Sequence, residues 1–340
     1  MKFRRLIKRT AEEIGATIRI AKVTSWGEAL NTFRAKADIQ KMVRNGYRES
    51  PAAKKRLLKK HATMIRYFEK TFGDFLSTYQ LVVPAPESNS SDQTIWICWW
   101  QGLENAPDIV KACVESIRRN AGHHPIVIVT EENYREYVDI PEWVEKKRKQ
   151  GIISRTNFSD LLRFSLLAKH GGLWLDATFF CCGNLDSCFQ GDVWSIKRPD
   201  YLHCSVACGM FAGYSLRCSY GARWIFAPMR DYFLHYWENN DRLIDYLLVD
   251  YMVVLAEKQY PAIANYFDQI PPNNPMCDEL CNLLNQKYDE EQWRKISEDT
   301  ILFKLTWKQS FSSHDTFFDR VLSGELRRQD ASNKDAGINI

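Results

Sequence analysis

The stretch NFSDLLRFSLLAKHGGLWLDAT, residues 157–178, decides the fold class of this chain. Its first part is largely apolar and predicts a helix over residues 158–170 that is buried on most sides, with Ser159 as its cap. Gly171 and Gly172 end this helix, since glycine tolerates the left-handed conformation that the turn needs. The chain then enters a strand, residues 173–176, which presents Asp176 at its carboxyl end. A helix followed directly by such a strand is typical of an α/β sheet.

Two charged residues stand out on the predicted helix. Asp160 and Arg163 are three positions apart, so a helix places them on one face. Desolvation of both charges roughly cancels their attraction, and stability alone does not explain the pair on a buried helix. With Asp176 opposite, the pair is suited to hold a ribose hydroxyl, or a divalent metal that bridges a diphosphate. The alternative is a surface ion pair, with Asp176 capping a turn.

Alternating strands and helices surround this stretch. Strands are expected at residues 94–100, 126–130, 193–196 and 209–212, and helices at about 108–120, 131–138, 141–149 and 223–266, with a last element at 301–307. The pattern predicts a mostly parallel sheet covered by helices. Ligands of such sheets bind outside the carboxyl ends of the strands, which places Trp99 to Gly102 and Asp176 near the chemistry.

The basic residues are concentrated at the N-terminus. Residues 1–60 hold 17 Lys/Arg and 5 Asp/Glu, although the net charge of the whole chain is only +4. Helices are expected over residues 1–80, followed by a linker at 82–93. Residues 1–22 fit a basic amphipathic helix on an anionic membrane surface, and equally a solvated helix that packs on the fold. Nucleic acid is a third reading, but the chain shows no nucleic-acid module, and no such partner is expected.

Composition excludes several classes of protein. With 340 residues, 45% hydrophobic and 26% charged, the chain is globular and not of low complexity. Its ten cysteines form no CxxC pair, which argues against a zinc ribbon or a thioredoxin-like site. No apolar run reaches the length of a membrane span, and no signal-peptide segment follows the basic start. These features predict a cytoplasmic protein with reduced thiols, peripheral on the inner face of the cell membrane if residues 1–22 bind lipid.

The motif SDLLR, followed after seven residues by GGLWLDAT, resembles the capsular polysaccharide synthesis protein family, which is similar to the sugar transferases of glycosyltransferase family 32. The family pattern is SDxxR, then GG, an aromatic residue and DXD. The resemblance covers about residues 94–310, including IWICWWQG with Ala106-Pro107, Ile244-Asp245-Tyr246 and FKLTWK at 303–308. It implies a GT-A fold: a Rossmann-like mixed, mostly parallel sheet flanked by helices, with an added N-terminal helical region and a C-terminal helical block.

The resemblance also implies an activity, the transfer of a sugar from a nucleoside diphosphate sugar to a lipid-linked or polymeric glycan, with retention of configuration. Asp160 would bind sugar or ribose hydroxyls, Arg163 the sugar and diphosphate, and Asp176 would be the first acid of DXD. Trp100 would stack on the base, while Trp96 and Trp99 belong to the core. The further donor-binding residues are Gln101, Gly102, Ser159, Gly171, Gly172, Ala177, Thr178, Lys304, Thr306, Trp307 and Lys308.

One position departs from the family pattern. The second acid of DXD is Thr178, so a hard cation such as Mn²⁺ or Mg²⁺ loses an anionic ligand. Asp176 and His314 are the candidate metal ligands. If the site works without metal, Lys304, Lys308 and His314 are the candidates to neutralise the leaving diphosphate. The alternative for this C-terminal stretch is an amphipathic strand with a polar loop.

The expected organisation is a basic helical region and linker at 1–90, a GT-A domain at 91–325 and a polar tail at 326–340. The domain comprises a nucleotide-binding core at about 91–222, a helical acceptor-side block at 223–300 and a C-terminal motif at 301–315. The acids of the helical block are expected to be solvated: Asp231, Glu238, Asp245 and Asp250. Two other functions stay open, namely transfer of a sugar phosphate and non-catalytic binding of a nucleotide or glycan.

Overall fold

A computed structural model gives the structure of the protein and describes residues 2–84, 93–311 and 314–328. Its centre is a five-stranded sheet of order β2-β1-β3-β6-β5, formed by Ile126–Val129, Ile95–Cys98, Gly172–Leu175, Ser215–Cys218 and Val193–Ser195. β1 pairs in parallel with β2 and β3, whereas β6 is antiparallel to β3 and β5. The sheet is mixed: β1, β2, β3 and β5 run in the same direction and only β6 runs against them, which agrees with the prediction of a mostly parallel sheet. No crossover helix separates β5 from β6, and strands joined without one pair antiparallel.

The strand order reverses at β1. The chain passes from β1 to β2 on one side and returns to β3 on the other, so the carboxyl ends of β1 and β3 flank the switch point. Ligands of open α/β sheets bind at such a crevice. Trp99 follows β1 and Asp176 follows β3, and both therefore lie at the edge where chemistry was expected.

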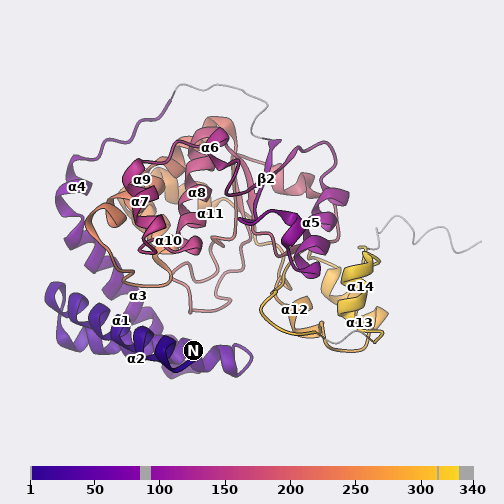
Figure 1. Cartoon of the computed structure of the whole chain (residues 1–340), viewed down its shortest axis with the longest axis horizontal. Coiled ribbons are helices and arrows are strands. Elements are labelled where there is room, and N and C mark those ends of the chain that lie inside the picture. Colours follow the sequence, from indigo (N-terminus) through magenta and orange to yellow (C-terminus); the bar gives the residue numbers. More distant parts are fainter. Residues whose placement is uncertain (1, 85–92, 312–313, 329–340) are drawn as a thin grey trace, which may run out of the picture.

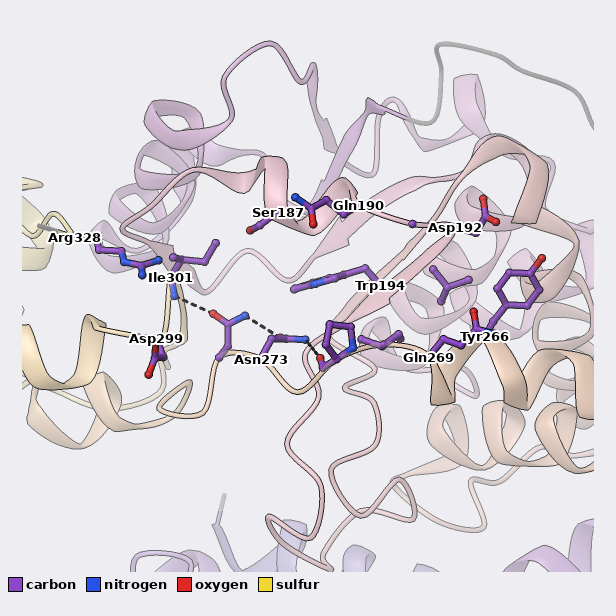
Figure 2. Close-up of a pocket in the computed structure, with 15 residues that line it drawn as sticks. Ser187, Gln190, Asp192, Trp194, Tyr266, Gln269, Asn273, Asp299, Ile301 and Arg328 are labelled. Carbon is purple, nitrogen blue, oxygen red and sulfur yellow. Dashed lines mark hydrogen bonds between the residues drawn. The ribbon is translucent and has the colours of Figure 1, made fainter. Parts of the chain in front are cut away.

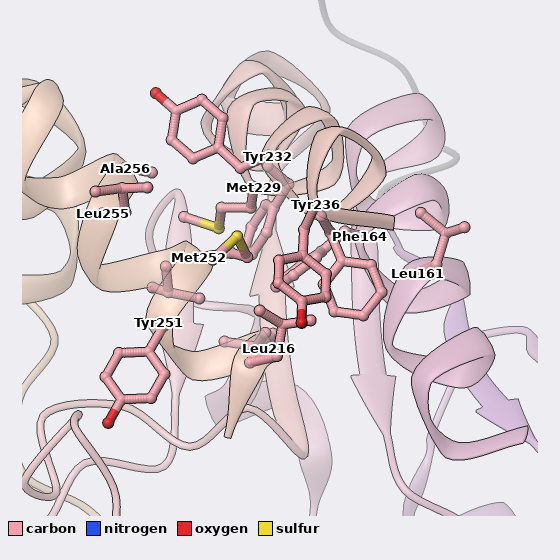
Figure 3. Packing of buried hydrophobic residues seen from close by; sticks show 14 of the residues in the cluster. Leu161, Phe164, Leu216, Met229, Tyr232, Tyr236, Tyr251, Met252, Leu255 and Ala256 are labelled. Atoms are coloured by element: carbon pink, nitrogen blue, oxygen red, sulfur yellow. The ribbon is translucent and has the colours of Figure 1, made fainter. Parts of the chain in front are cut away.

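Side chains of the strands alternate between two hydrophobic layers, as the period of two requires. Trp96 and Trp174 face α8 (Arg155–His170), α9 (Phe226–Asn239) and α10 (Leu248–Gln259), whose packing is shown in Figure 3. Ile97 and Leu173 belong to the second layer, with α5 (Asp108–Asn120) and the C-terminal elements. These are α12 (Glu279–Leu283), α13 (Glu290–Ser297) and α14 (Phe317–Ser323) (Figure 1).

A second, two-stranded sheet completes the core. β4 (Phe179–Cys181) follows Asp176 after a short turn and pairs antiparallel with β7 (Leu302–Lys304), with Phe179 opposite Lys304. This pairing joins the chain just after β3 to its C-terminal part, and it brings Lys304 next to the end of β3.

Four helices precede the sheet: α1 (Lys2–Val23), α2 (Trp26–Arg44), α3 (Pro51–Thr71) and α4 (Gly73–Thr78). α1 and α2 lie side by side beneath the rest of the molecule (Figure 1). α3 packs against α10, where Phe68 contacts Tyr251 at a ring-centroid distance of 5.5 Å, and Phe68 also contacts Tyr236 of α9 at 6.3 Å. The N-terminal region therefore shares its apolar core with the helices over the sheet.

Several predicted elements differ from those observed. α8 begins at Arg155 with Ser154 as its cap, because the Ser154 hydroxyl accepts from the amide of Asn157. Ser159 therefore lies inside the helix and is not its cap. Residues 209–212 form no strand; the chain there turns through Cys208 and Gly209 with positive φ, and the strand follows at β6. The helix expected at 131–138 is one turn, α6 (Tyr134–Tyr137).

The remaining described elements are α7 (Glu142–Lys149), α11 (Pro261–Asp268) and three short 3-10 turns, Leu103–Asn105, Leu185–Phe189 and Tyr220–Ile225. All ten cysteines lie in the described part of the chain, and all are free thiols. Among the described residues no helix is long and apolar enough to cross a membrane. Most of the predicted linker and the tail from residue 329 lie outside the described residues.

Candidate active site

Asp176 lies where β3 ends, with its side chain 30% exposed. Its amide donates to the carbonyl of Tyr214 at 3.1 Å, which fixes the backbone against the loop before β6. The indole N–H of Trp174, two residues earlier, donates to Oδ1 at 3.1 Å. The carboxylate is held in one orientation with part of its surface open to a ligand.

Asp160 and Arg163 meet on α8, as their spacing predicts, and both are buried, at 5% and 6% exposure. Arg163 Nη2 lies 3.3 Å from Asp160 Oδ1 and 3.4 Å from Asp176 Oδ1. Its Nη1 donates to the carbonyl of Gly213, and the guanidinium lies over the Trp174 ring. The alternative of a surface pair is wrong, because both charges are inside the fold. Arg163 Nε has no hydrogen-bond partner in the described chain.

Lys304 joins the site from the far end of the sequence. Its Nζ lies 3.1 Å from Asp176 Oδ2 and donates to Thr178 Oγ1 at 2.5 Å. The pairing of β4 with β7 fixes the lysine backbone, and the ammonium lies 5.5 Å from the ring centre of Phe179. Asp176 is therefore held between two cations that come from different elements.

The two carboxyls respond to these neighbours in opposite directions. Burial alone would raise the pKa of Asp176, but Lys304 and Arg163 lower it below its ordinary value. Burial raises the pKa of Asp160 to about 7. The charge of Arg163 opposes this rise, and the charge of Asp176 adds to it. Asp176 is therefore an anion at neutral pH, whereas Asp160 is close to half-protonated there.

Tryptophans after β1 take different places from those predicted. Trp100 is buried between Tyr134 and Phe158, at ring-centroid distances of 5.3 and 5.2 Å, with Arg148 over its ring. It is a core residue, because the turn after β1 directs it into the layer of α7 and α8. Trp99, predicted to be core, is partly exposed and contacts Trp307, which is exposed.

The other predicted donor residues fall into three groups. Ser159, Ala177 and Thr178 lie on α8 and in the turn after β3, on the side of the carboxylates. Gly171 and Gly172 lie at the amino end of β3, the opposite end of the strand from Asp176, so the prediction that they bind the donor is not supported. Gln101 and Lys308 are exposed, and Gly102 and Thr306 are partly exposed. His314 is exposed in the loop before α14. No described contact joins His314 to Asp176, so the structure does not support that pair as metal ligands.

Sequence reasoning missed several residues at the site. Asp250, expected to be solvated, is buried and accepts from Ser205 Oγ at 2.8 Å. Tyr246 is 72% exposed, yet surrounding protein and the carboxylates of Asp160, Asp176 and Asp250 raise its pKa, which places it at the rim. Asp250 lies in the first turn of α10 and Tyr246 in the segment before this helix, so their place at the site depends on how α10 packs.

Asp245 was also expected to be solvated, but it is buried in an ion pair with the N-terminal helices. Its Oδ2 lies 3.0 Å from Lys60 Nζ of α3 and 3.6 Å from Lys36 Nζ of α2. The pair fixes the segment that carries Tyr246, its neighbour in the chain. The N-terminal region thus supports one side of the site.

A pocket of about 570 Å³ lies elsewhere, along the outer edge strand β5 (Figure 2). Trp194, Gln190 and Tyr266 line it, and none of the charged residues around Asp176 does. Asn273 and Asn274 in its wall bond to main-chain atoms and to each other, which is a structural role. The carboxylates and cations of the candidate site are not part of it.

Comparison with known proteins gives one match. The family model of the capsular polysaccharide synthesis proteins matches residues 44–321, which extends the similarity from the motif region back to α3. No curated protein and no solved structure matches significantly. Because the match spans most of the sequence and contains the whole site around Asp176, the chain belongs to the capsular polysaccharide synthesis protein family.

Proposed function

We propose that the protein is a glycosyltransferase with a GT-A-type domain that transfers a sugar from a nucleoside diphosphate sugar to a capsular or other cell-surface polysaccharide. One observation carries the proposal. At the switch in strand order, the Asp176 carboxylate is held 3.4 Å from the Arg163 guanidinium and 3.1 Å from the Lys304 ammonium. A nucleotide sugar offers hydroxyls for a carboxylate and a diphosphate for cations, so both halves of such a donor find partners.

The reaction needs stabilisation of the leaving group above all. The bond from the anomeric carbon to the β-phosphate oxygen breaks, and its electron pair leaves with the nucleoside diphosphate. An acceptor hydroxyl oxygen forms the new bond to the same carbon, and its proton passes to the departing phosphate oxygen. Arg163 and Lys304 stabilise the charge that develops on the diphosphate. Attack on the face that the phosphate leaves retains the configuration and needs no separate base.

The acceptor side is assigned to the rim that carries Tyr246. Its exposed ring offers an apolar face on which a sugar can stack, beside the carboxyls of Asp160 and Asp250. The acceptor is a lipid-linked or polymeric glycan, in agreement with the family to which the chain belongs.

Calorimetric titration with UDP, GDP and CDP tests the donor site, followed by assay of the sugar nucleotide with the base that binds. Release of the nucleoside diphosphate with transfer supports the proposal. Release of the monophosphate would instead identify a sugar-phosphate transferase, and binding without any turnover a non-catalytic protein. Absence of binding by all three nucleotides would contradict a donor site at Asp176.

A further inference from the structure

We infer that the Lys304 ammonium takes the place of the divalent cation in the donor site, so that the donor binds without metal. This inference rests on the proposed function. Lys304 Nζ contacts Asp176 Oδ2 at 3.1 Å and Thr178 Oγ1 at 2.5 Å. These two residues occupy the first and last positions of the DXD motif, and the lysine therefore lies between the two groups that would hold a metal.

The residues present do not fit a divalent cation. Mg²⁺ and Mn²⁺ are bound through carboxylates, and this site offers one carboxylate whose two oxygens already face Arg163 and Lys304. Thr178 contributes a neutral hydroxyl that accepts from the ammonium. A dication at this position would meet a fixed positive charge in place of the second carboxylate.

The lysine is held for such a role. Its backbone is paired in β7 opposite Phe179, and its ammonium lies 5.5 and 5.6 Å from the ring centres of Phe179 and Tyr214. An ammonium has three N–H donors. Two have partners in the described chain, Asp176 and Thr178, which leaves the third for an oxygen of the diphosphate.

The test measures binding of the nucleoside diphosphate, with EDTA and with Mn²⁺, by calorimetry on the full chain. Wild-type affinity is expected to be the same in both. Lys304→Met should lose about 10- to 100-fold in affinity, the value of a hydrogen bond to a charged group, while Lys304→Arg keeps part of it. Lys169→Met is the matched control, since Lys169 pairs with Asp139 at 2.9 Å on the surface.

The double variant Lys304→Met/Thr178→Asp restores a second carboxylate and removes the competing cation. It should bind the nucleotide only when Mn²⁺ is present, and its unfolding midpoint shows whether it is folded. If EDTA weakens nucleotide binding by the wild type, or if Lys304→Met binds the nucleotide with wild-type affinity, the inference about Lys304 is overturned. The proposal of a donor site at Asp176 would still stand. A folded wild type that binds no nucleotide under either condition contradicts the donor site itself, and with it the inference.

An independent feature lies on α2, where three large apolar side chains face solvent. Trp26, Leu30 and Phe33 are 62%, 48% and 42% exposed and recur at the i, i+4 and i+7 positions of one helix face. The opposite face, with Ala35 and Met42, is buried. We name Trp26, Leu30 and Phe33 the α2 stripe.

The charges beside the α2 stripe are positive. Both acids of α2 are paired with arginines of α3: Glu28 with Arg66, and Asp38 with Arg56 at 2.6 Å. The exposed basic side chains of α2 have no ion-pair partner among the described residues: Arg34, Lys41 and Arg44. An apolar stripe with Trp, Leu and Phe flanked by unopposed cations is typical of helices that lie in the interface of an anionic membrane.

We propose that the α2 stripe lies on an anionic lipid surface. The sequence placed this role on residues 1–22; on α1 the side chains of residues 2–9 lie outside the described residues, and Ile14 and Ile18 are exposed. Insertion of the α2 stripe removes its apolar area from water, while the cations face the lipid headgroups.

Sedimentation with phosphatidylglycerol-containing vesicles and with phosphatidylcholine vesicles tests the proposal. The wild type should bind the anionic vesicles, and Trp26→Ser/Leu30→Ser/Phe33→Ser should lose about tenfold or more. Leu322→Ser, which removes a leucine of α14 that is 38% exposed, is the control. Equal binding of the triple variant, or equal binding to neutral vesicles, contradicts the proposal. If the wild type binds no vesicles but forms a dimer that the triple variant does not form, the α2 stripe is instead an interface with a second copy of the chain.

Discussion

Asp176 determines the arrangement of charge at the site, because it is the counterion of Arg163 and of Lys304. Asp176→Asn keeps the shape of the side chain and removes the charge that orders both cations. Turnover of the donor is expected to fall about 100- to 1000-fold, as for loss of a group that stabilises the transition state. Release of nucleoside diphosphate measures it. Asp139→Asn, which removes an exposed partner of Lys169, should retain turnover. Wild-type turnover in Asp176→Asn would place the chemistry elsewhere.

Gly172, the first residue of β3, is required by its backbone and by its surroundings. Its φ is 92°, and a Cβ there would lie 2.5 Å from the carbonyl oxygen of Thr94. Gly172→Ala is expected to lower the free energy of unfolding by at least about 2 kcal/mol, measured in urea. Gly27 of α2 has no neighbour within 4 Å, so Gly27→Ala should be neutral or stabilise by up to about 1 kcal/mol. Equal effects of the two substitutions would show that β3 tolerates a side chain at this junction.

At the scale of elements, α3 is joined to the helices over the sheet by a buried chain of hydrogen bonds. Lys60 Nζ donates to the Tyr251 hydroxyl at 3.1 Å, and this hydroxyl lies 2.8 Å from His61 Nδ1. His61 Nε2 lies 2.8 Å from the carbonyl oxygen of His203. A neutral imidazole that donates from Nε2 and accepts at Nδ1 satisfies both contacts.

This burial makes stability depend on pH through His61. Burial, with the charge of Lys60, lowers the pKa of His61 from 6.5 to about 4. Between these values the unfolded chain binds a proton that the folded chain does not, so stability falls as pH falls. The loss amounts to about 3 kcal/mol. His61→Gln should remove this part of the slope in urea unfolding between about pH 7 and pH 4.5. Exposed His123→Gln should leave the slope unchanged, and an unchanged slope in His61→Gln would contradict a buried neutral imidazole.

For the molecule as a whole, the N-terminal helices are expected to contribute unequally. Removal of residues 1–48 deletes α1 and α2 but keeps α3, with Phe68 and the Lys60–Asp245 pair. This truncated protein should fold with a lower unfolding midpoint and still bind nucleotide. Removal of residues 1–80 also exposes the apolar surface of α10 and leaves Asp245 as a buried unpaired charge, so it should fail to fold. Far-UV circular dichroism and soluble yield measure the folding of both truncated proteins. If the protein without residues 1–80 folds, α3 is not required for folding.

Prediction from sequence succeeded where neighbours in the chain are also neighbours in space. The helix expected at about 108–120 is observed as Asp108–Asn120, and Asp160 meets Arg163 because three positions on a helix share a face. It was wrong where a boundary or orientation depends on distant contacts. Ser154, not Ser159, caps α8, and Trp100, not Trp99, is buried. Composition and spacing are nearly the same for each of these pairs, and only packing distinguishes them.

The sequence by itself determined the family, the junction of α8 and β3, and the acid at the carboxyl end of that strand. All of these depend on local sequence: the spacing of apolar and charged residues along one segment, and the two adjacent glycines that end the helix. Only the tertiary structure decided that Lys304, one of several candidate cations, contacts Asp176 and Thr178, and that Asp245 is buried against α3. The physical reason is that pairing of β4 with β7 and packing of α3 join segments distant in the chain, and the local pattern of a segment does not encode its partner.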